Sequence, residues 1–150
     1  MDKWDRRFLD LARTVGSWSK DPSTKVGAVI TQGKYVLSLG FNGFPPDVED
    51  REEWLNNREE KYKRTIHAEI NALCSLNQNC EEPDYNLCTL YVTPLMPCED
   101  CAKALAIRGF NRVVCEIPEV LPDHWIPHKQ VTERIFRDYK VKFICHTLTH

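Results

Sequence analysis

The sequence predicts one α/β domain spanning residues 1–150, in which a mixed five-stranded sheet lies between layers of helices. Three observations lead to this prediction. An amphipathic N-terminal segment precedes two short apolar runs joined by a tight turn, and strand-like and helix-like patterns then alternate to the end of the chain. Such alternation gives right-handed crossovers between parallel strands, whereas the two apolar runs form an antiparallel hairpin. With 150 residues, 42% of them hydrophobic, the chain can bury a core without disulfides.

The first third of the chain supplies a helix and the hairpin. Apolar residues in segment 2–18 recur at helical spacing, with arginines and aspartates between them, so this helix is expected to pack one face on the core. Residues 26–31 and 35–41 are apolar almost throughout, which indicates strands covered on both faces. The glycine and prolines within residues 42–46 end the second strand sharply.

The middle of the chain is highly charged. Residues 47–64 mix acidic and basic side chains, which is typical of a solvated helix with internal ion pairs. Lys61, Lys63 and Arg64 come close enough to the histidine at position 67 to help hold a phosphate. Exposure to solvent is nevertheless the expected state of these three side chains.

Strand and helix patterns alternate in the second half. The expected elements are a helix at 67–76, a polar loop at 77–84, a strand at 88–93, a helix at 98–108, a strand at 111–116, a helix at 128–139 and a strand at 141–145. Gly109 is placed to end its helix. Ligands bind such sheets at the carboxyl ends of strands, beside helix N-termini, and the motifs described below fall at such places.

Composition excludes several classes of protein. The formal net charge is -2, so the overall balance does not attract a polyanion such as a nucleic acid. No apolar run is long enough to span a membrane, and the N-terminus is too polar for a signal peptide. Seven cysteines, an odd number, suit a reducing compartment better than a disulfide framework. We therefore expect a cytoplasmic protein (in the host cytoplasm, if the source is viral) that binds neither membranes nor nucleic acids.

One imidazole and two thiols are spaced as a metal site. His67 is followed two residues later by Glu69, and Cys98 and Cys101 stand three residues apart after Pro97. Three such ligands suit Zn²⁺ and leave its fourth position open, as in catalytic sites. Positions two apart do not share a helix face, so His67 and Glu69 reach one pocket only if His67 precedes its helix. The two cysteines share a first helical turn, where the helix dipole stabilises thiolates.

Two less specific interpretations stay open. A C-x-x-C pair alone is often redox-active or half of a structural zinc site. Cys74, one heptad after His67, could complete a closed structural site, which would make the chain a non-catalytic, zinc-stabilised binding module. Glu69 argues for catalysis, because a structural site has no need of a carboxylate beside the metal.

With these motifs the chain resembles the cytidine deaminase superfamily, and within it the deoxycytidylate (dCMP) deaminases, over nearly its whole length. The resemblance is carried by S-K-D-P at 19–22 with V-G-A at 26–28, G-F-N-G-x-P at 40–45, H-A-E at 67–69, L-Y-V-T at 90–93 and P-C-x-x-C at 97–101. The zinc motifs alone would also admit tRNA adenosine, guanine, riboflavin-precursor or free cytidine deaminases. The resemblance implies the three-layer α/β/α fold of that superfamily.

The resemblance also implies a reaction, the zinc-dependent hydrolysis of dCMP to dUMP and ammonia. One Zn²⁺ would be held by His67, Cys98 and Cys101, and would make a water molecule more acidic. Glu69 would carry protons between that water, the ring and the leaving amine.

Substrate contacts follow from the same resemblance. The backbone N–H of Ala68 is expected to meet the pyrimidine carbonyl, and Asn42 the sugar or base. Ser23, Lys25 and Lys20 are candidate phosphate contacts by their position in the sequence.

Substrate range and regulation stay open. The alternatives to dCMP alone are dCTP, both nucleotides, or another cytosine nucleotide. Many family members are hexamers that bind dCTP or dTTP near the G-x-N-G turn, and Mg²⁺ would accompany such a nucleotide. Here Phe41 replaces the family's tyrosine and residues 46–48 lack its glycine, which leaves allosteric control undecided. A homo-oligomer is expected, with the hexamer as the family's usual state.

Overall fold

The computed structural model describes residues 1–79, 81 and 83–148, and it contains the five-stranded sheet that the sequence predicts. The strands are β1 (Gly27–Gln32), β2 (Tyr35–Phe41), β3 (Cys88–Thr93), β4 (Arg112–Ile117) and β5 (Lys142–Thr147). Their order across the sheet is β2-β1-β3-β4-β5. β1 is antiparallel to both of its neighbours, while β3, β4 and β5 are parallel, so the sheet is mixed as predicted.

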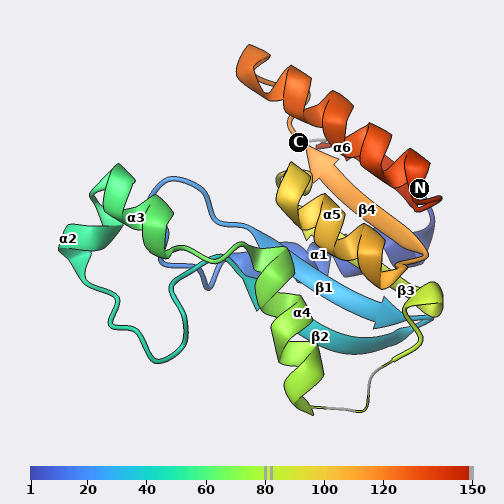
Figure 1. Cartoon of the computed structure of the whole chain (residues 1–150), viewed down its shortest axis with the longest axis horizontal. Helices are drawn as coiled ribbons and strands as arrows, with labels where there is room; N and C mark the ends of the chain where they lie inside the picture. The colour runs from blue at the N-terminus through green and yellow to red at the C-terminus, as the bar shows by residue number, and fades with distance from the viewer. Residues whose placement is uncertain (80, 82, 149–150) are drawn as a thin grey trace.

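Helices cover both faces of this sheet (Figure 1). They are α1 (Lys3–Gly16), α2 (Glu52–Leu55), α3 (Arg58–Arg64), α4 (Ala68–Asn79), α5 (Glu99–Arg108) and α6 (Ile126–Asp138), with short 3₁₀ helices at Tyr85–Leu87 and Asp123–Trp125. α1 packs on one face, α4, α5 and α6 pack on the other, and α2 and α3 lie together at one end of the molecule. Within the described residues, every helix is too short or too polar to cross a bilayer.

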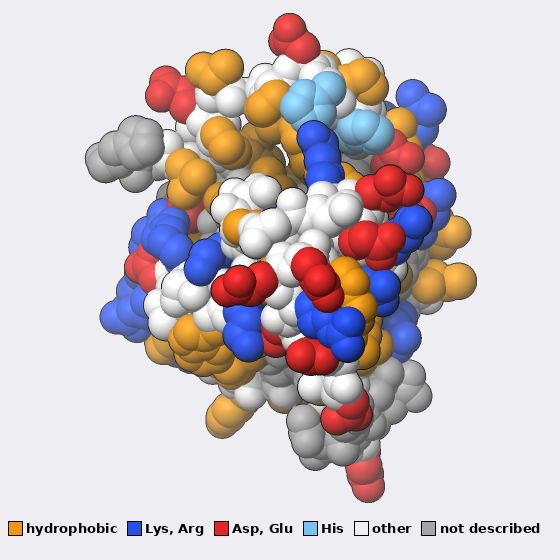
Figure 2. Space-filling view, turned by 90° about the vertical axis from the view of Figure 1, so that its left-hand side faces the viewer, with side chains coloured by type: hydrophobic (Ala, Val, Ile, Leu, Met, Phe, Trp, Pro, Cys, Tyr) orange, Lys and Arg blue, Asp and Glu red, His pale blue; other side chains and the backbone are white. Residues whose placement is uncertain are grey.

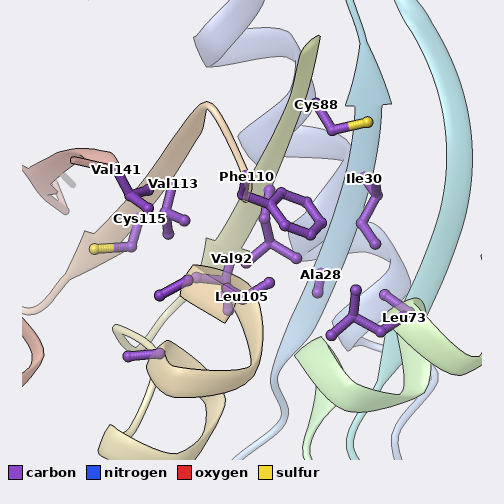
Figure 3. Close-up of a cluster of buried hydrophobic side chains, with 14 of the residues drawn as sticks. Ala28, Ile30, Leu73, Cys88, Val92, Leu105, Phe110, Val113, Cys115 and Val141 are labelled. Atoms are coloured by element: carbon purple, nitrogen blue, oxygen red, sulfur yellow. The ribbon is translucent and has the colours of Figure 1, made fainter. Parts of the chain in front are cut away.

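Alternate residues of the central strands contribute to two hydrophobic clusters. Along β3, Leu90 and Val92 pack in the cluster beneath α4, α5 and α6, whereas Tyr91 between them packs against α1. This period-2 alternation of two apolar faces is expected of a sheet covered on both sides. Figure 3 shows the larger cluster, in which Leu73 of α4 and Leu105 of α5 pack over the strands.

Two glycines allow helices to approach the sheet closely. A Cβ at Gly27 would lie 1.8 Å from the carbonyl oxygen of Ala12 in α1, and a Cβ at Gly40 would lie 2.4 Å from the carbonyl oxygen of Ala68 in α4. Only a residue without a side chain fits such contacts. Gly40 therefore helps to set the position of the N-terminus of α4 against β2.

The hairpin is only partly buried. Tyr35, Val36 and Phe41 of β2 are exposed, so the prediction that both faces are covered is correct for β1 and wrong for β2. β2 forms one edge of the sheet, and an edge strand has a neighbour on one side only. Its apolar composition does not reveal that position.

The charged middle segment and the end of α4 also differ from the prediction. Residues 47–64 form two short helices instead of one, because Asn57 starts a second helix by accepting a hydrogen bond from the backbone N–H of Glu60. α4 continues to Asn79, so it occupies the first residues of the predicted loop at 77–84. Residues 80 and 82 of that loop lie outside the described part of the chain.

Candidate metal centre and adjoining cavity

His67 is placed immediately before α4. Ile66 pairs with Gly43 through two backbone hydrogen bonds of 2.8 and 3.1 Å, which fixes the approach to the helix. The carbonyl of His67 accepts the first helical hydrogen bond, from the N–H of Asn71 at 3.0 Å. The histidine thus has the position before the helix that the H-x-E spacing requires, and Glu69 follows in the first turn.

Cys98 and Cys101 occupy the start of α5. Cys98 is the N-cap, and its Sγ accepts a hydrogen bond from the backbone N–H of Cys101 at 3.4 Å. The Cys101 thiol, and after it His67, lower the pKa of the Cys98 thiol to about 4 against the opposing effect of burial. The same contact raises the pKa of the Cys101 thiol, so the pair favours one thiolate, on Cys98. The thiolate is the form of cysteine that binds metals. Gly109 ends this helix in the left-handed region at φ 85°, as predicted.

The three candidate ligand atoms form a cluster at these helix N-termini. Nδ1 of His67 lies 3.5 Å from Sγ of Cys98 and 3.4 Å from Sγ of Cys101, and all three atoms are within 4.8 Å of one another. A tetrahedral Zn²⁺, bound at about 2.0–2.1 Å to nitrogen and about 2.3 Å to sulfur, needs ligand atoms about 3.5–3.8 Å apart. The donor set and its spacing therefore fit this ion. Cys74 is exposed and outside the cluster, so no fourth side chain of the described residues closes the site.

Glu69 lies beside this cluster without belonging to it. The residue is 4% exposed, and burial raises the pKa of its carboxyl to about 6. Its oxygens are not among the clustered ligand atoms. A buried carboxyl next to three candidate metal ligands has the chemistry that a general acid and base requires.

A cavity of about 260 Å³ adjoins the cluster. Its metal end is lined by His67, Ala68, Glu69 and Cys98. What we call the polar wall consists of Asp21, Ser23, Thr24, Asn42 and Lys61. What we call the apolar wall consists of Leu95, Met96 and Trp125. An apolar surface with a few convergent polar groups is typical of a small-molecule site.

Figure 2 views the molecule from the side on which α2 and α3 lie. It shows a hollow bordered by hydrophobic side chains, with acidic and basic side chains interspersed around it. On the face drawn there, basic side chains are mixed with acidic ones.

Some of the predicted substrate-binding residues line the cavity and others do not. Ala68, Asn42 and Ser23 line the cavity. Lys25 is exposed and does not line it, so its contact with a phosphate stays a prediction. Lys20 pairs with Asp50 at 2.8 Å.

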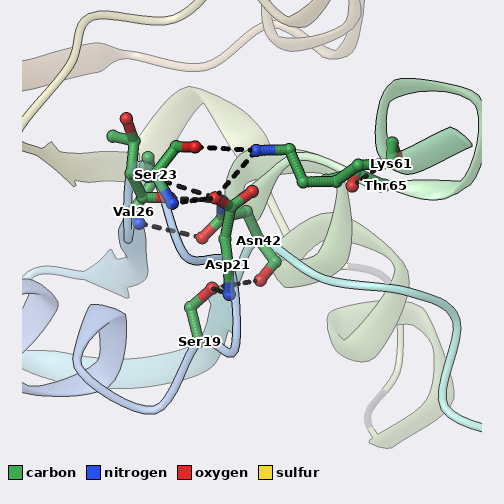
Figure 4. A network of polar contacts seen from close by, with 8 residues as sticks. Ser19, Asp21, Ser23, Val26, Asn42, Lys61 and Thr65 are labelled. Atoms are coloured by element: carbon green, nitrogen blue, oxygen red, sulfur yellow. Dashed lines mark hydrogen bonds and ion pairs between the residues drawn. The ribbon is translucent and has the colours of Figure 1, made fainter. Parts of the chain in front are cut away.

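The amide of Asn42 is largely engaged with the backbone. Its Oδ1 accepts a hydrogen bond from the N–H of Val26, and its Nδ2 donates to the carbonyl of Thr24, both at 2.9 Å (Figure 4). An amide can form about four hydrogen bonds, so these two leave one N–H and one lone pair for a ligand.

Lys61 and Trp125 line the cavity. For Lys61 the sequence raised a phosphate contact only as the alternative to exposure, and it predicted no site role for Trp125. Lys61 is 5% exposed, so the expectation that it faces solvent is wrong. A charge run gives no indication of which of its members the fold will bury. Trp125 follows the loop after the carboxyl end of β4, and this is the signal that could have identified it.

Comparisons with known proteins confirm the resemblance. The family described as "Cytidine and deoxycytidylate deaminase zinc-binding region" matches residues 2–117. The chain is 41% identical over 137 residues to an uncharacterized deaminase in the luxG 3' region of Aliivibrio fischeri, covering 91% of this chain and 88% of that protein. It is 39% identical over 115 residues to a probable deoxycytidylate deaminase of Caenorhabditis elegans and 34% identical over 119 residues to the deoxycytidylate deaminase of Mus musculus.

Coverage differs among these relatives. The nematode and mouse alignments cover 74% and 75% of this chain but only 56% and 64% of the two animal proteins, so the chain spans less than two thirds of their length. Among solved structures, the dCMP deaminase of the cyanophage S-TIM5 aligns over 97% of this chain and 98% of its own, with a TM-score of 0.75 and 21% identity. At that identity the likeness supports the fold alone.

Proposed function

The chain belongs to the family of cytidine and deoxycytidylate deaminases that share this zinc-binding region, and from this premise we propose that it hydrolyses dCMP to dUMP and ammonia. One observation carries the proposal: three zinc-type ligands and a buried carboxylate meet in a cavity of about 260 Å³. The choice of dCMP is supported by the relatives named deoxycytidylate deaminase. We extend the proposal to residues 1–150 as a single domain that acts in the cytoplasm.

The residues at the metal end would divide the chemistry between them. His67, Cys98 and Cys101 would hold one Zn²⁺, whose Lewis acidity lowers the pKa of a water molecule towards about 7. Glu69 takes one proton of the attacking water and passes it to ring nitrogen N3. It then transfers the second proton to the leaving amine, so the water oxygen stays on C4 and ammonia departs.

The walls of the cavity would orient the substrate. The apolar wall receives the pyrimidine ring, and the backbone N–H of Ala68 contacts its carbonyl. Asn42 uses the hydrogen-bonding capacity left by its backbone contacts for the sugar or base. Ser23 and Lys25 are proposed phosphate contacts, and Lys25→Met tests the one that lies outside the cavity.

A substrate panel tests the proposal. Zinc-loaded protein is incubated with dCMP, dCTP, CMP, deoxycytidine and single-stranded DNA, and ammonia and the uracil product are measured. We expect the highest kcat/KM with dCMP. A higher kcat/KM with dCTP would mean that dCTP, and not dCMP, is the substrate. Zinc-loaded protein without activity on any of these compounds would favour the binding-module alternative.

Nucleotide regulation is the second part of the proposal. A further cavity of about 340 Å³, lined by Phe41, Gly43 and Pro45 among others, lies where the G-F-N-G-x-P turn ends β2. We propose this cavity as the place where dCTP or dTTP would bind with Mg²⁺, and we propose a homo-oligomer, with a hexamer as the expected state. Turnover of dCMP is measured with and without each triphosphate and Mg²⁺, alongside the sedimentation mass. Identical kinetics in all conditions would contradict this part.

A further inference from the structure

The side chain of Lys61 is buried in the wall of the cavity. It is 5% exposed, although the side chain of Lys63 on the same helix, α3, is 61% exposed. Lysine is almost never fully buried unless its charge is paired. Among the described residues that line the cavity, Lys61 is the one lysine or arginine.

The ammonium group is held by the turn at residues 21–24. Nζ of Lys61 donates to Oδ1 of Asp21 at 3.1 Å and to Oγ of Ser23 at 3.2 Å (Figure 4). The same Oδ1 accepts the backbone N–H of Ser23 at 2.8 Å and of Thr24 at 3.1 Å. The Asp21 carboxylate thus accepts from three donors. It positions the ammonium group of Lys61 but occupies only one of the three ammonium hydrogens.

Both groups retain a donor for an occupant of the cavity. An ammonium has three N–H bonds, of which these contacts use two, and the Ser23 hydroxyl accepts from Lys61 while keeping its own hydrogen. Two adjacent donors, one of them charged, suit an anion with several acceptor oxygens. A phosphate monoester has this chemistry, whereas a neutral nucleoside does not.

We propose that Lys61, positioned by Asp21, binds the 5′-phosphate of the substrate and so makes the enzyme select a nucleotide over its nucleoside. The inference rests on the proposed function, because it places the base at the metal end of the same cavity. A charge-assisted contact is stronger in a partly dehydrated cavity than on the surface. The competing role is a structural clamp that joins α3 to the turn.

Lys61→Met is the direct test, and Lys63→Met on the same helix is the matched control. Because the single change leaves Asp21 without its cation, the double variant Lys61→Met/Asp21→Asn is prepared as well. We expect kcat/KM for dCMP to fall about 10- to 100-fold in both Lys61 variants, mainly through KM, since a hydrogen bond to a charged group is lost. The kcat/KM for deoxycytidine should not change, and Lys63→Met should leave both substrates unaffected.

Binding provides a readout that does not depend on turnover. In calorimetry, the wild-type protein should bind dUMP more tightly than deoxyuridine, and inorganic phosphate should compete with dUMP. Both Lys61→Met variants should lose most of this preference. Lys61→Arg, which keeps the positive charge, should recover part of it.

The inference and the proposed function fail in different ways. Equal losses with dCMP and deoxycytidine at unchanged zinc content would show a structural clamp and overturn the inference. Full dCMP activity in Lys61→Met, or a wild-type protein without preference for dUMP over deoxyuridine, would also overturn it. A zinc-loaded wild-type protein that releases no ammonia from dCMP would overturn the proposed function, while the binding comparison would still decide the role of Lys61.

Discussion

At the scale of single residues, the position of each side chain relative to a helix start determines what it can do. His67 precedes α4 and Glu69 lies in its first turn, so an imidazole and a carboxylate two residues apart both line the cavity. Cys98 and Cys101, by contrast, share one helical turn and can both reach a metal from within it. Glu69 is the member of this group whose oxygens lie outside the cluster of ligand atoms, and it is the residue that we propose moves protons.

Replacement of that carboxylate should separate proton transfer from metal binding. Glu69→Gln keeps the size of the side chain but cannot accept a proton, so we expect kcat for dCMP to fall about 10²- to 10⁴-fold. Metal analysis should find the zinc content unchanged, because His67, Cys98 and Cys101 remain. Glu53→Gln, at an exposed position on α2, is the control. Robust turnover by Glu69→Gln would refute the role assigned to this residue.

At the scale of elements, contacts between helices and the sheet determine where the metal site lies. α4 approaches β2 so closely that Gly40 has no room for a Cβ beside Ala68 and Ala72. The hydroxyl of Ser38 in β2 donates to the carbonyl of Ala72 at 2.6 Å, which holds the same pair of elements together. The first turn of α4, with Glu69, is therefore positioned by its contact with β2.

A single methyl group at this contact should displace the helix. In Gly40→Ala the new Cβ would meet the backbone of Ala68 and Ala72, and overpacking of this kind costs about 1–3 kcal/mol or more. Urea denaturation should show the lower free energy of unfolding. Gly43→Ala is the stability control, because a Cβ there meets no atom within 4 Å. A Gly40→Ala protein as stable as the wild type would contradict the close approach.

At the scale of the whole molecule, a buried carboxylate joins α1 to the two neighbouring strands β3 and β4. Asp5 of α1 accepts hydrogen bonds from Arg112 of β4, at 2.8 and 3.2 Å, and from the Tyr91 hydroxyl of β3 at 2.7 Å. Burial raises the pKa of Asp5, but the hydrogen bonds from Arg112 and Tyr91 together lower it by more than burial raises it. The net shift of the Asp5 pKa is therefore downward. The ionised carboxylate is therefore part of the folded state.

Removal of one partner should cost more than removal of both. Arg112→Met leaves a carboxylate that is 4% exposed without its cation, and we expect a loss of about 3 kcal/mol in the free energy of unfolding. The double variant Asp5→Asn/Arg112→Met should recover much of it, because no buried charge is left unpaired. Urea denaturation of the wild type, Arg112→Met and the double variant at pH 7 measures both the loss and the recovery in the free energy of unfolding. A double variant that is no more stable than Arg112→Met would show that the two residues do not act as a pair.

The same pair predicts a dependence on pH. A folded-state pKa below that of the unfolded chain means that Asp5 stabilises the fold above about pH 3.9, and that this stabilisation is lost as the pH falls through the lower folded value. Between pH 7 and pH 3, the wild-type protein should therefore lose more stability than Asp5→Asn/Arg112→Met. Parallel losses would contradict the downward shift.

The sequence by itself determined the order of the elements, their approximate bounds and the residues that the structure gathers into the metal cluster. Periodicity, caps and motif spacing are short-range properties, so β2, β3 and the two helix starts at His67 and Cys98 could be predicted. Only the tertiary structure decided that β2 forms an edge, that Lys61 is buried and that Trp125 reaches the cavity. These outcomes depend on which distant segments meet, and no local pattern encodes that meeting.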